Sequence, residues 1–191
     1  MENQPNVEKM MTKKDVKNLI KALKHKDTVW YVRRDIVRAL GGIGGKDVVE
    51  HLAQAKDEVY DVQLEAARAL DKMGFKPRND TEKAHLLLAQ EKYDKLAELE
   101  MPAVEPLTQV LRRFGKPEIA NSLIRIGEPA VEPLIGALGA QAAWARYQAA
   151  RALGEIGDAR AIDALTQVLE KETNNEILEV AKNAIVKIKG K

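Results

Sequence analysis

The chain has 191 residues, of which 45% are hydrophobic, 31% are charged and only 4% are aromatic. Because there is no cysteine, disulfides, thiolate metal sites and cysteine nucleophiles are excluded, and three histidines leave little for an imidazole metal site. The scarcity of aromatic residues argues against a β-sandwich. The abundance of Ala, Leu, Lys and Glu favours an all-helical protein.

The first residues, Met1 to Met11, are polar and lack the apolar core of a signal peptide. The longest tight apolar run, Leu86 to Ala89, is far too short to span a membrane. We therefore expect a cytoplasmic protein with no membrane association and a flexible N-terminal segment over residues 1–12.

The small net charge of +2 is unevenly distributed. Residues 1–46 carry 11 Lys or Arg against 5 Asp or Glu, whereas the remainder carries 20 against 24. A basic first part on a mildly acidic body is not the strong single-sign field typical of a nucleic-acid binder.

The first predicted helix carries a row of lysines spaced three or four residues apart, which places them on one helix face. They are Lys14, Lys17, Lys21 and Lys24. Arg112 and Arg113 add a second basic pair further along the chain. The lysine row could be a solvated face, a partner contact or a nucleic-acid contact.

Three segments of the chain align without gaps, over residues 32–44, 62–74 and 145–157. Each contains Arg-Ala-Leu, followed by two residues, Ile or Met, and Gly. Weaker copies end at Gly127 and near Gly190. A period of about 30 residues is typical of stacked helical repeats.

A second set of segments alternates with the first, over residues 103–107, 130–134 and 161–165, with looser copies at 15–19 and 48–52. The repeating unit is thus a first helix (helix A), a glycine stop, a second helix (helix B) and a turn. The glycines expected to end the A helices with positive φ are Gly44, Gly74, Gly127 and Gly157. Because one helix pair has too little apolar face to fold alone, we predict a single all-α domain over residues 13–190, a right-handed α-solenoid of about six pairs.

The period is interrupted between Phe75 and Leu99. Residues 77–80 read as a turn, with Asp80 or Thr81 as the N-cap of a helix. Apolar residues at helical spacing follow and predict one or two helices in place of a normal unit. The insert at about 75–99 is either a structural spacer or a functional elaboration.

Arg146 to Asp158, followed by the Ala-Ile-Asp-Ala-Leu segment at 161–165, resembles HEAT repeats of the phycobilin-lyase type. The resemblance covers about residues 14–188 and implies an α-solenoid, while its members range from chromophore-lyase subunits to scaffolds. The chain also resembles the HEAT-repeat deoxyhypusine hydroxylases, in which His-Glu pairs hold a di-iron centre. No His-Glu pair occurs here, and the equivalent positions are 34–35, 64–65, 147–148 and 179–180. We therefore expect no metal site and no cofactor.

The predicted B helices place acidic and amide side chains in register. Two residues before each core leucine lie Glu50, Glu105, Glu132 and Asp163, and two residues after it lie Gln54, Gln109 and Gln167. In the first unit Lys17 and Lys21 hold these positions. Because B helices line the concave surface in HEAT-like solenoids, the rows could bind a basic protein segment. Alternatively, the acids pair with Arg38, Arg68 and Arg151, or complement the helix N-termini.

Aromatic residues stand near the start of two A helices, with Tyr31 and Trp144 in register and Trp30 beside them. We expect these rings to pack between repeats, although joint exposure would make them binding anchors. We expect the histidines, His25, His51 and His85, to lie at the surface or at helix edges.

These observations predict a non-enzymatic, monomeric scaffold or adaptor that binds a protein or peptide through its concave B-helix surface. The candidate partner-binding residues are Lys17, Lys21, Lys24, Glu50, Gln54, Glu105, Gln109, Arg112, Glu132, Asp163 and Gln167. The alternatives are an accessory subunit of a phycobilin-lyase-like or other protein-modifying enzyme, and a nucleic-acid-binding protein. Four carboxylates along one groove would repel phosphate, which makes nucleic acid the weaker alternative.

Overall fold

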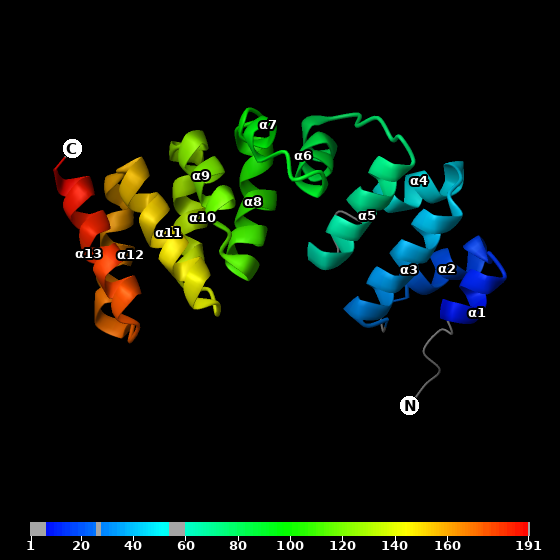
Figure 1. The fold of residues 1–191 in the computed structure, drawn as a ribbon, viewed down its shortest axis with the longest axis horizontal. Coiled ribbons are helices and arrows are strands. Elements are labelled where there is room, and N and C mark those ends of the chain that lie inside the picture. Colours follow the sequence, from blue (N-terminus) through cyan, green and yellow to red (C-terminus); the bar gives the residue numbers. More distant parts are fainter. Residues whose placement is uncertain (1–6, 26–27, 54–59, 191) are drawn as a thin grey trace. The chain divides into compact units, whose positions relative to one another are not determined.

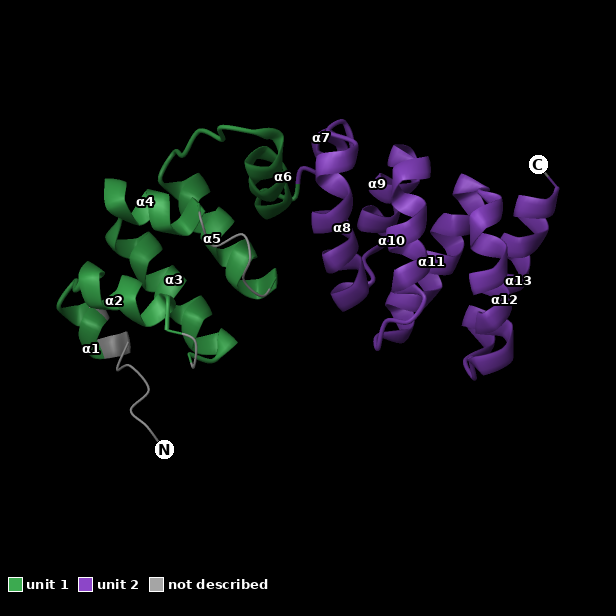
Figure 2. Ribbon diagram, turned by 180° about the vertical axis from the view of Figure 1, so that it is seen from behind, with its two compact units in different colours: residues 1–91 green, residues 92–191 purple. Residues whose placement is uncertain are grey.

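A computed structural model describes residues 7–25, 28–53 and 60–190. Within this part the chain is helical, with short connections and no strand (Figure 1). It divides into two compact units, residues 1–91 and residues 92–191 (Figure 2).

The helices of unit 1 are α1 (Val7–Thr12), α2 (Val16–Leu23), α3 (Trp30–Ile43), α4 (Lys46–Ala53), α5 (Tyr60–Lys72) and α6 (Asp80–Ala89). Those of unit 2 are α7 (Tyr93–Ala97), α8 (Met101–Phe114), α9 (Pro117–Ile126), α10 (Val131–Ala137), α11 (Ala143–Ile156), α12 (Ile162–Lys171) and α13 (Asn175–Lys189). Two 3-10 turns, η2 (Glu128–Ala130) and η3 (Ala159–Ala161), lead into α10 and α12.

The helices form the two layers that the repeat predicts. In unit 2 the A helices α9, α11 and α13 pack side by side, and the B helices α8, α10 and α12 pack against them. In unit 1, α3 lies along α5, while α2 packs on α3 and α4 packs on α5. The predicted fold class, an all-α solenoid of HEAT-like helix pairs, is therefore confirmed.

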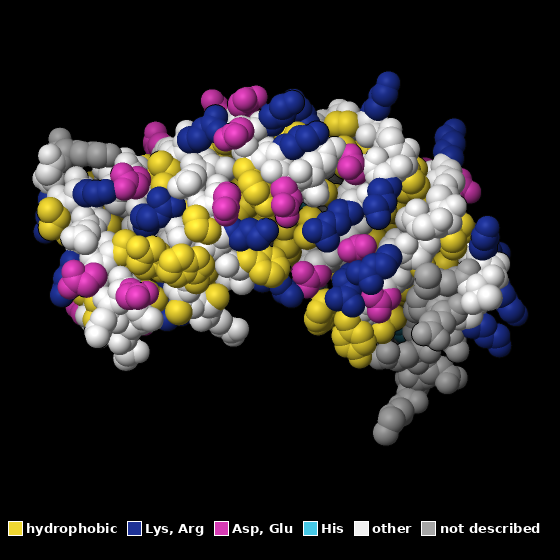
Figure 3. Space-filling model, viewed as in Figure 1, with side chains coloured by type: hydrophobic (Ala, Val, Ile, Leu, Met, Phe, Trp, Pro, Cys, Tyr) yellow, Lys and Arg dark blue, Asp and Glu magenta, His cyan; other side chains and the backbone are white. Residues whose placement is uncertain are grey.

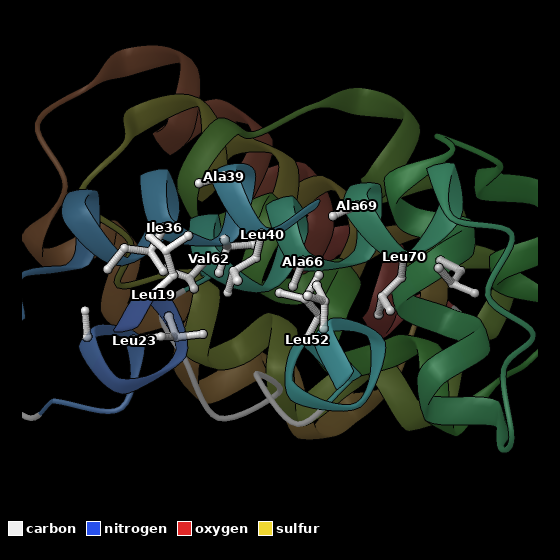
Figure 4. Close-up of a cluster of buried hydrophobic side chains, with 14 residues drawn as sticks. Leu19, Leu23, Ile36, Ala39, Leu40, Leu52, Val62, Ala66, Ala69 and Leu70 are labelled. Atoms are coloured by element: carbon white, nitrogen blue, oxygen red, sulfur yellow. The ribbon is translucent and has the colours of Figure 1, made fainter. Parts of the chain in front are cut away.

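The core of unit 1 is built from the apolar face of each helix. Leu19 of α2, Leu40 of α3 and Leu52 of α4 meet Val62 and Leu70 of α5 (Figure 4), and all five are buried. In unit 2 the same positions of the repeat hold fully buried leucines: Leu107, Leu123, Leu134, Leu153 and Leu165. The three- and four-residue spacing of the apolar residues therefore forms a continuous core in each unit.

All four glycines predicted to end A helices adopt positive φ. Gly157, for example, closes α11 at φ 79°, and its N–H donates to the Leu153 carbonyl at 2.9 Å. The others, with φ between 68° and 79°, are Gly44, Gly74 and Gly127. Any other L-residue would be strained there, which explains the regular Gly in the sequence repeat.

Neighbouring A helices touch at small residues. A Cβ added to Gly41 of α3 would lie 2.5 Å from the Ala69 Cβ on α5. A Cβ added to Gly154 of α11 would lie 2.7 Å from the Ala184 Cα on α13. The Gly of the Arg-Ala-Leu-Gly sequence thus lets neighbouring A helices approach closely, because it contacts an Ala on the next helix.

The structure corrects three local predictions. Residues 7–12, expected within a flexible segment, form α1, and Met10 packs against the core of unit 1. Lys14 is not on the lysine face, because Asp15 caps α2 by accepting from the Asn18 N–H and the helix begins after it. The insert helix is capped by Asn79 instead of Asp80 or Thr81, through the Glu82 N–H at 2.9 Å.

None of the described helices combines the length and the apolar composition that a membrane span requires.

Candidate partner-binding surface

The predicted binding residues of unit 2 lie on the exposed sides of the three B helices. Glu105, Gln109 and Arg112 follow one another along α8, Glu132 lies on α10, and Asp163 and Gln167 lie on α12. All are exposed except Gln109, which is half-buried. A spacing of three or four residues keeps the members of each helix on one face. The structure therefore brings six of the predicted residues onto the B-helix layer of unit 2.

The acids of this face differ in how strongly neighbouring side chains bind them. The Glu105 carboxylate accepts a hydrogen bond from the Gln109 side-chain amide at 2.8 Å. Glu132 lies 4.0 Å from the Arg160 guanidinium. Asp163 makes no ion pair with any residue in the described part of the chain. The face therefore keeps negative charge available to a ligand.

Arg160 is a cation of this region that sequence reasoning missed. Its guanidinium bonds the Asp158 carboxylate at 2.6 Å, and this pairing lowers the pKa of Asp158 to about 2. It also reaches Glu128, at 3.3 Å, across the turns that precede α10 and α12. Because Arg160 falls outside the aligned repeat positions, its link between successive turns had no sequence signal.

The two alternative roles of the acidic row, pairing with arginines and complementing helix N-termini, are only partly observed. Arg38 pairs with Glu65 at 3.1 Å, and Arg68 also faces Glu65, so these arginines pair with an A-helix acid instead of the B-helix row. Arg151 donates to Asn121 at 2.8 Å. Helix-terminus complementation applies to the acids in first turns, Glu132 of α10 and Asp163 of α12. Glu50 and Glu105 lie beyond the first turns of α4 and α8.

A groove runs beside the acidic row between α10 and α12. It encloses about 470 Å³. Ile135, Leu138 and Val168 give it apolar walls, and Gln167 and Lys171 also line it. The groove can accept an apolar side chain from a partner that also contacts the polar row.

An ion pair closes one side of this groove. Arg146 binds Glu172 through two hydrogen bonds, the shorter 2.7 Å from Nε to Oε2, and also donates to the Ala140 and Gln141 carbonyls at 2.9 Å. Only 8% of the Glu172 side chain is exposed, and the bonds from Arg146 lower the pKa of Glu172 to about 2. Since these bonds hold both side chains in place, we assign the pair a structural role in the groove.

The predicted residues of unit 1 lie on α2 and α4. Lys17 and Lys21 lie on α2, Lys24 is its C-cap, and Glu50 lies on α4; all four are exposed. Gln54 lies outside the described residues. The pKa of Arg78 is raised mainly by the hydrogen bonds that it donates to Glu82, and the charge of Glu50 adds to this effect.

The insert contributes a cavity within unit 1. Phe75, Arg78 and His85 of the insert line it together with Leu70 of α5, and it encloses about 260 Å³. Arg78 bonds Glu82 at 2.7 Å and lies 5.8 Å from the Phe75 ring centroid. The first helix of the insert, α6, thus packs on α5 and leaves a small hollow there.

The histidines occupy ordinary positions. His51 and His85 each bond the backbone carbonyl four residues earlier, at 2.8 Å, and His25 is exposed. Across the described residues no group of three or more His, Asp or Glu side chains is arranged to hold a metal ion.

The expectation that Trp30, Tyr31 and Trp144 pack between repeats is wrong. Trp30, Tyr31 and Trp144 expose 41%, 47% and 47% of their surface. Trp144 stacks on Tyr147, with ring centroids 4.8 Å apart and planes at 4°. The repeat contained one signal for this pair, because Tyr147 stands where unit 1 has Arg34.

Comparison with known proteins identifies the repeats. A family model described as HEAT repeats matches residues 10–71 and 104–185. No curated protein matches the sequence. Among solved structures, human deoxyhypusine hydroxylase in complex with glycerol is 20% identical, with 97% of this chain and 77% of that chain covered and a TM-score of 0.48. An engineered protein is 22% identical, with 92% and 97% covered and a TM-score of 0.33.

Proposed function

The chain belongs to the HEAT-repeat family, and from that premise we propose that it is a non-enzymatic scaffold that binds an extended segment of a partner protein. The segment lies across the B-helix face of unit 2. One observation carries the proposal: the apolar groove between α10 and α12 opens beside a row of exposed acids.

The chemistry of the face selects the segment. The walls of Ile135, Leu138 and Val168 favour an aliphatic side chain, whose burial is the main source of affinity. Asp163 on α12 and Glu105 on α8 favour basic residues at two points along the segment, since complementary charge steers encounter and fixes register. The ligand is therefore a peptide that combines an aliphatic anchor with flanking Arg or Lys.

The test is peptide binding measured by fluorescence anisotropy. The probes are labelled peptides with one central Leu and flanking Arg, against the same peptides with flanking Glu. We expect saturable binding of the basic set, and a loss of roughly tenfold or more in the double variant Glu105→Lys, Asp163→Lys. Val168→Glu places a charge in the groove and should also abolish binding.

The matched control is Glu118→Lys, the same charge reversal at an exposed site on α9 of the opposite layer. It should bind as the unaltered chain does. Equal binding of basic and acidic peptides, or equal losses in the control and the double variant, would overturn the proposal.

Two further measurements separate the alternatives. Tight binding of a mixed DNA and RNA panel that falls steeply with salt would replace the scaffold by a nucleic-acid-binding function. Visible absorbance from a bilin added to the purified protein and retained through gel filtration would replace it by an accessory role in a phycobilin-lyase type of enzyme.

A further inference from the structure

The stacked rings of Trp144 and Tyr147 form an aromatic surface at the start of α11. Nearly half of the Trp144 surface is exposed, which is unusual for so large an apolar side chain. On the face shown in Figure 3, hydrophobic side chains gather over the region of α11, with acidic side chains beside them. Contiguous exposed apolar surface with polar side chains at its rim is typical of an interaction site.

The position of Trp144 is set by the end of α8. Gly115 adopts φ 59°, and a Cβ there would lie 2.9 Å from the Trp144 Cδ1 and 2.7 Å from the backbone of Trp144 and Ala145. The indole edge is therefore packed against a glycine that admits no side chain. Stacking on Tyr147 constrains the ring from the other direction, so the pair is preorganised.

The two rings line a cleft together with polar residues of α13. The cleft encloses about 550 Å³, and its other walls are Asn175, Glu176, Glu179, Val180 and Asn183. Glu179 lies 3.7 Å from Lys182, whereas the Glu176 carboxylate makes no ion pair or hydrogen bond with another described residue. Aromatic faces and a carboxylate thus meet in one cleft, without a cation between them in the described part of the chain.

Unit 1 shows what the same repeat position does when it holds a cation. There the guanidinium of Arg34 lies 5.7 Å from the Trp30 ring centroid. In the aligned segments, Arg34 corresponds to Tyr147. At this position unit 2 has a ring, which stacks on Trp144, the residue aligned with Tyr31, and α13 adds the carboxylates.

We infer that the Trp144–Tyr147 cleft is a binding site for an arginine side chain of a partner polypeptide. A guanidinium stacks on an aromatic face and donates two parallel hydrogen bonds to a carboxylate, which the rings and Glu176 or Glu179 supply. Lysine, a compact and strongly hydrated charge, satisfies this arrangement less well. The site lies on the A-helix layer and goes beyond the B-helix face proposed above.

The test follows the indole N–H resonance of Trp144 in the full chain labelled with ¹⁵N. The probes are three blocked tripeptides, Gly-Arg-Gly, Gly-Lys-Gly and the same peptide with citrulline, which keeps the shape of arginine without its charge. We expect a saturable shift with arginine, a dissociation constant at least threefold weaker with lysine, and no saturable shift with citrulline. Equal shifts with arginine and citrulline would overturn the inference.

Variants locate the site. Glu176→Gln and Glu179→Gln together should weaken arginine binding at least fivefold while both keep side-chain volume and leave the indole signal observable. The matched control is Glu118→Gln on α9, which removes an exposed carboxylate of the same layer outside the cleft; it should change nothing. Equal weakening by the control, or unchanged binding in the double variant, would refute the assignment.

This experiment is independent of the proposed function. The Glu105→Lys, Asp163→Lys variant keeps the cleft intact and should retain the arginine response of Trp144. Loss of peptide binding on the B-helix face with a retained indole response would refute the proposed function but support the arginine cleft. Retained peptide binding with no indole response to arginine would refute the cleft but support the proposed function.

Discussion

Helices α3 and α11 occupy the same position of the repeat, one in each unit, and differ in the residue that follows a shared arginine. Both carry an arginine that binds the carbonyls of the preceding turn: Arg33 donates to Thr28 at 2.9 Å, and Arg146 donates to Ala140 at 2.9 Å. The next residue is Arg34 in α3 and Tyr147 in α11. The shared arginine belongs to the fold, and the residue beside it determines what the surface can bind.

The comparison also separates two kinds of ion pair. Arg38 and Glu65 join α3 to α5 at an exposed position, with 57% of the Arg38 side chain accessible. Arg146 and Glu172 join α11 to the end of α12 with the carboxylate nearly buried. Exposed pairs contribute little to stability, whereas breaking a buried pair leaves an uncompensated charge.

Removing Arg146 should therefore have the largest effect on the fold. We expect Arg146→Ala to lower the free energy of unfolding by about 3 kcal/mol, because Glu172 loses its charged partner and two backbone carbonyls lose a donor. Urea unfolding followed by circular dichroism measures the change. The matched control, Arg125→Ala, breaks an exposed pair with Asp94 in the same unit and should cost less than about 1 kcal/mol.

Similar costs in the two variants would show that the Arg146 pair is no more stabilising than a surface contact. The distinction between a structural arginine and a variable neighbour would then fail for unit 2.

The acid sensitivity of unit 2 should follow Glu172. Its pKa is lowered from 4.5 to about 2 in the folded chain, so its protonation opposes folding. The stabilisation is fully present above pH 4.5 and is lost as the pH falls toward 2. Urea midpoints between pH 5 and pH 2 should fall less steeply in Glu172→Gln than in the unaltered chain.

Asp158→Asn serves as the comparison, because the pKa of Asp158 is also lowered, to about 2, but its partner Arg160 is exposed. Solvent screening should leave the acid slope of this variant close to that of the unaltered chain. Identical slopes in the unaltered chain and Glu172→Gln would contradict the assignment of acid sensitivity to Glu172.

Much of the fold could be predicted from the sequence, because the aligned segments show which positions are apolar and where each A helix ends. Gly157 ends α11 and Leu153 is buried, as the aligned segments indicate. Local capping was less predictable: Asp80 and Thr81 are as good N-cap residues as Asn79, and only the surrounding chain selects among the three.

The candidate sites were predicted less completely. The row of Glu105, Glu132 and Asp163 followed from register alone, since helical spacing fixes the face of each residue. The cleft at Trp144 did not, because its carboxylates come from α13, and the register of one helix does not show which side chains of the next helix it meets. Contacts between successive repeats depend on the close approach of helices, which composition does not reveal.

That close approach supplies the smallest and most discriminating prediction, and it applies to both units. An alanine normally stabilises a helix relative to glycine by roughly 0.5 to 1 kcal/mol. At Gly154 an added Cβ would lie 2.7 Å from the Ala184 backbone, so we expect Gly154→Ala to destabilise by about 1 to 2 kcal/mol despite its better helix propensity. Gly136→Ala in α10 meets nothing within 4 Å and should stabilise.

Unit 1 offers the same contrast in adjacent residues of one helix. Gly41→Ala would place a methyl 2.5 Å from the Ala69 Cβ, whereas Gly42→Ala meets nothing within 4 Å. Thermal unfolding of the four variants should give two losses and two gains. Because backbone entropy acts alike at all four sites, opposite signs within each pair can come only from the contact between neighbouring A helices. A gain at Gly41 or Gly154 would mean that the helices can separate there at little cost, and that the repeated glycine is not needed for packing.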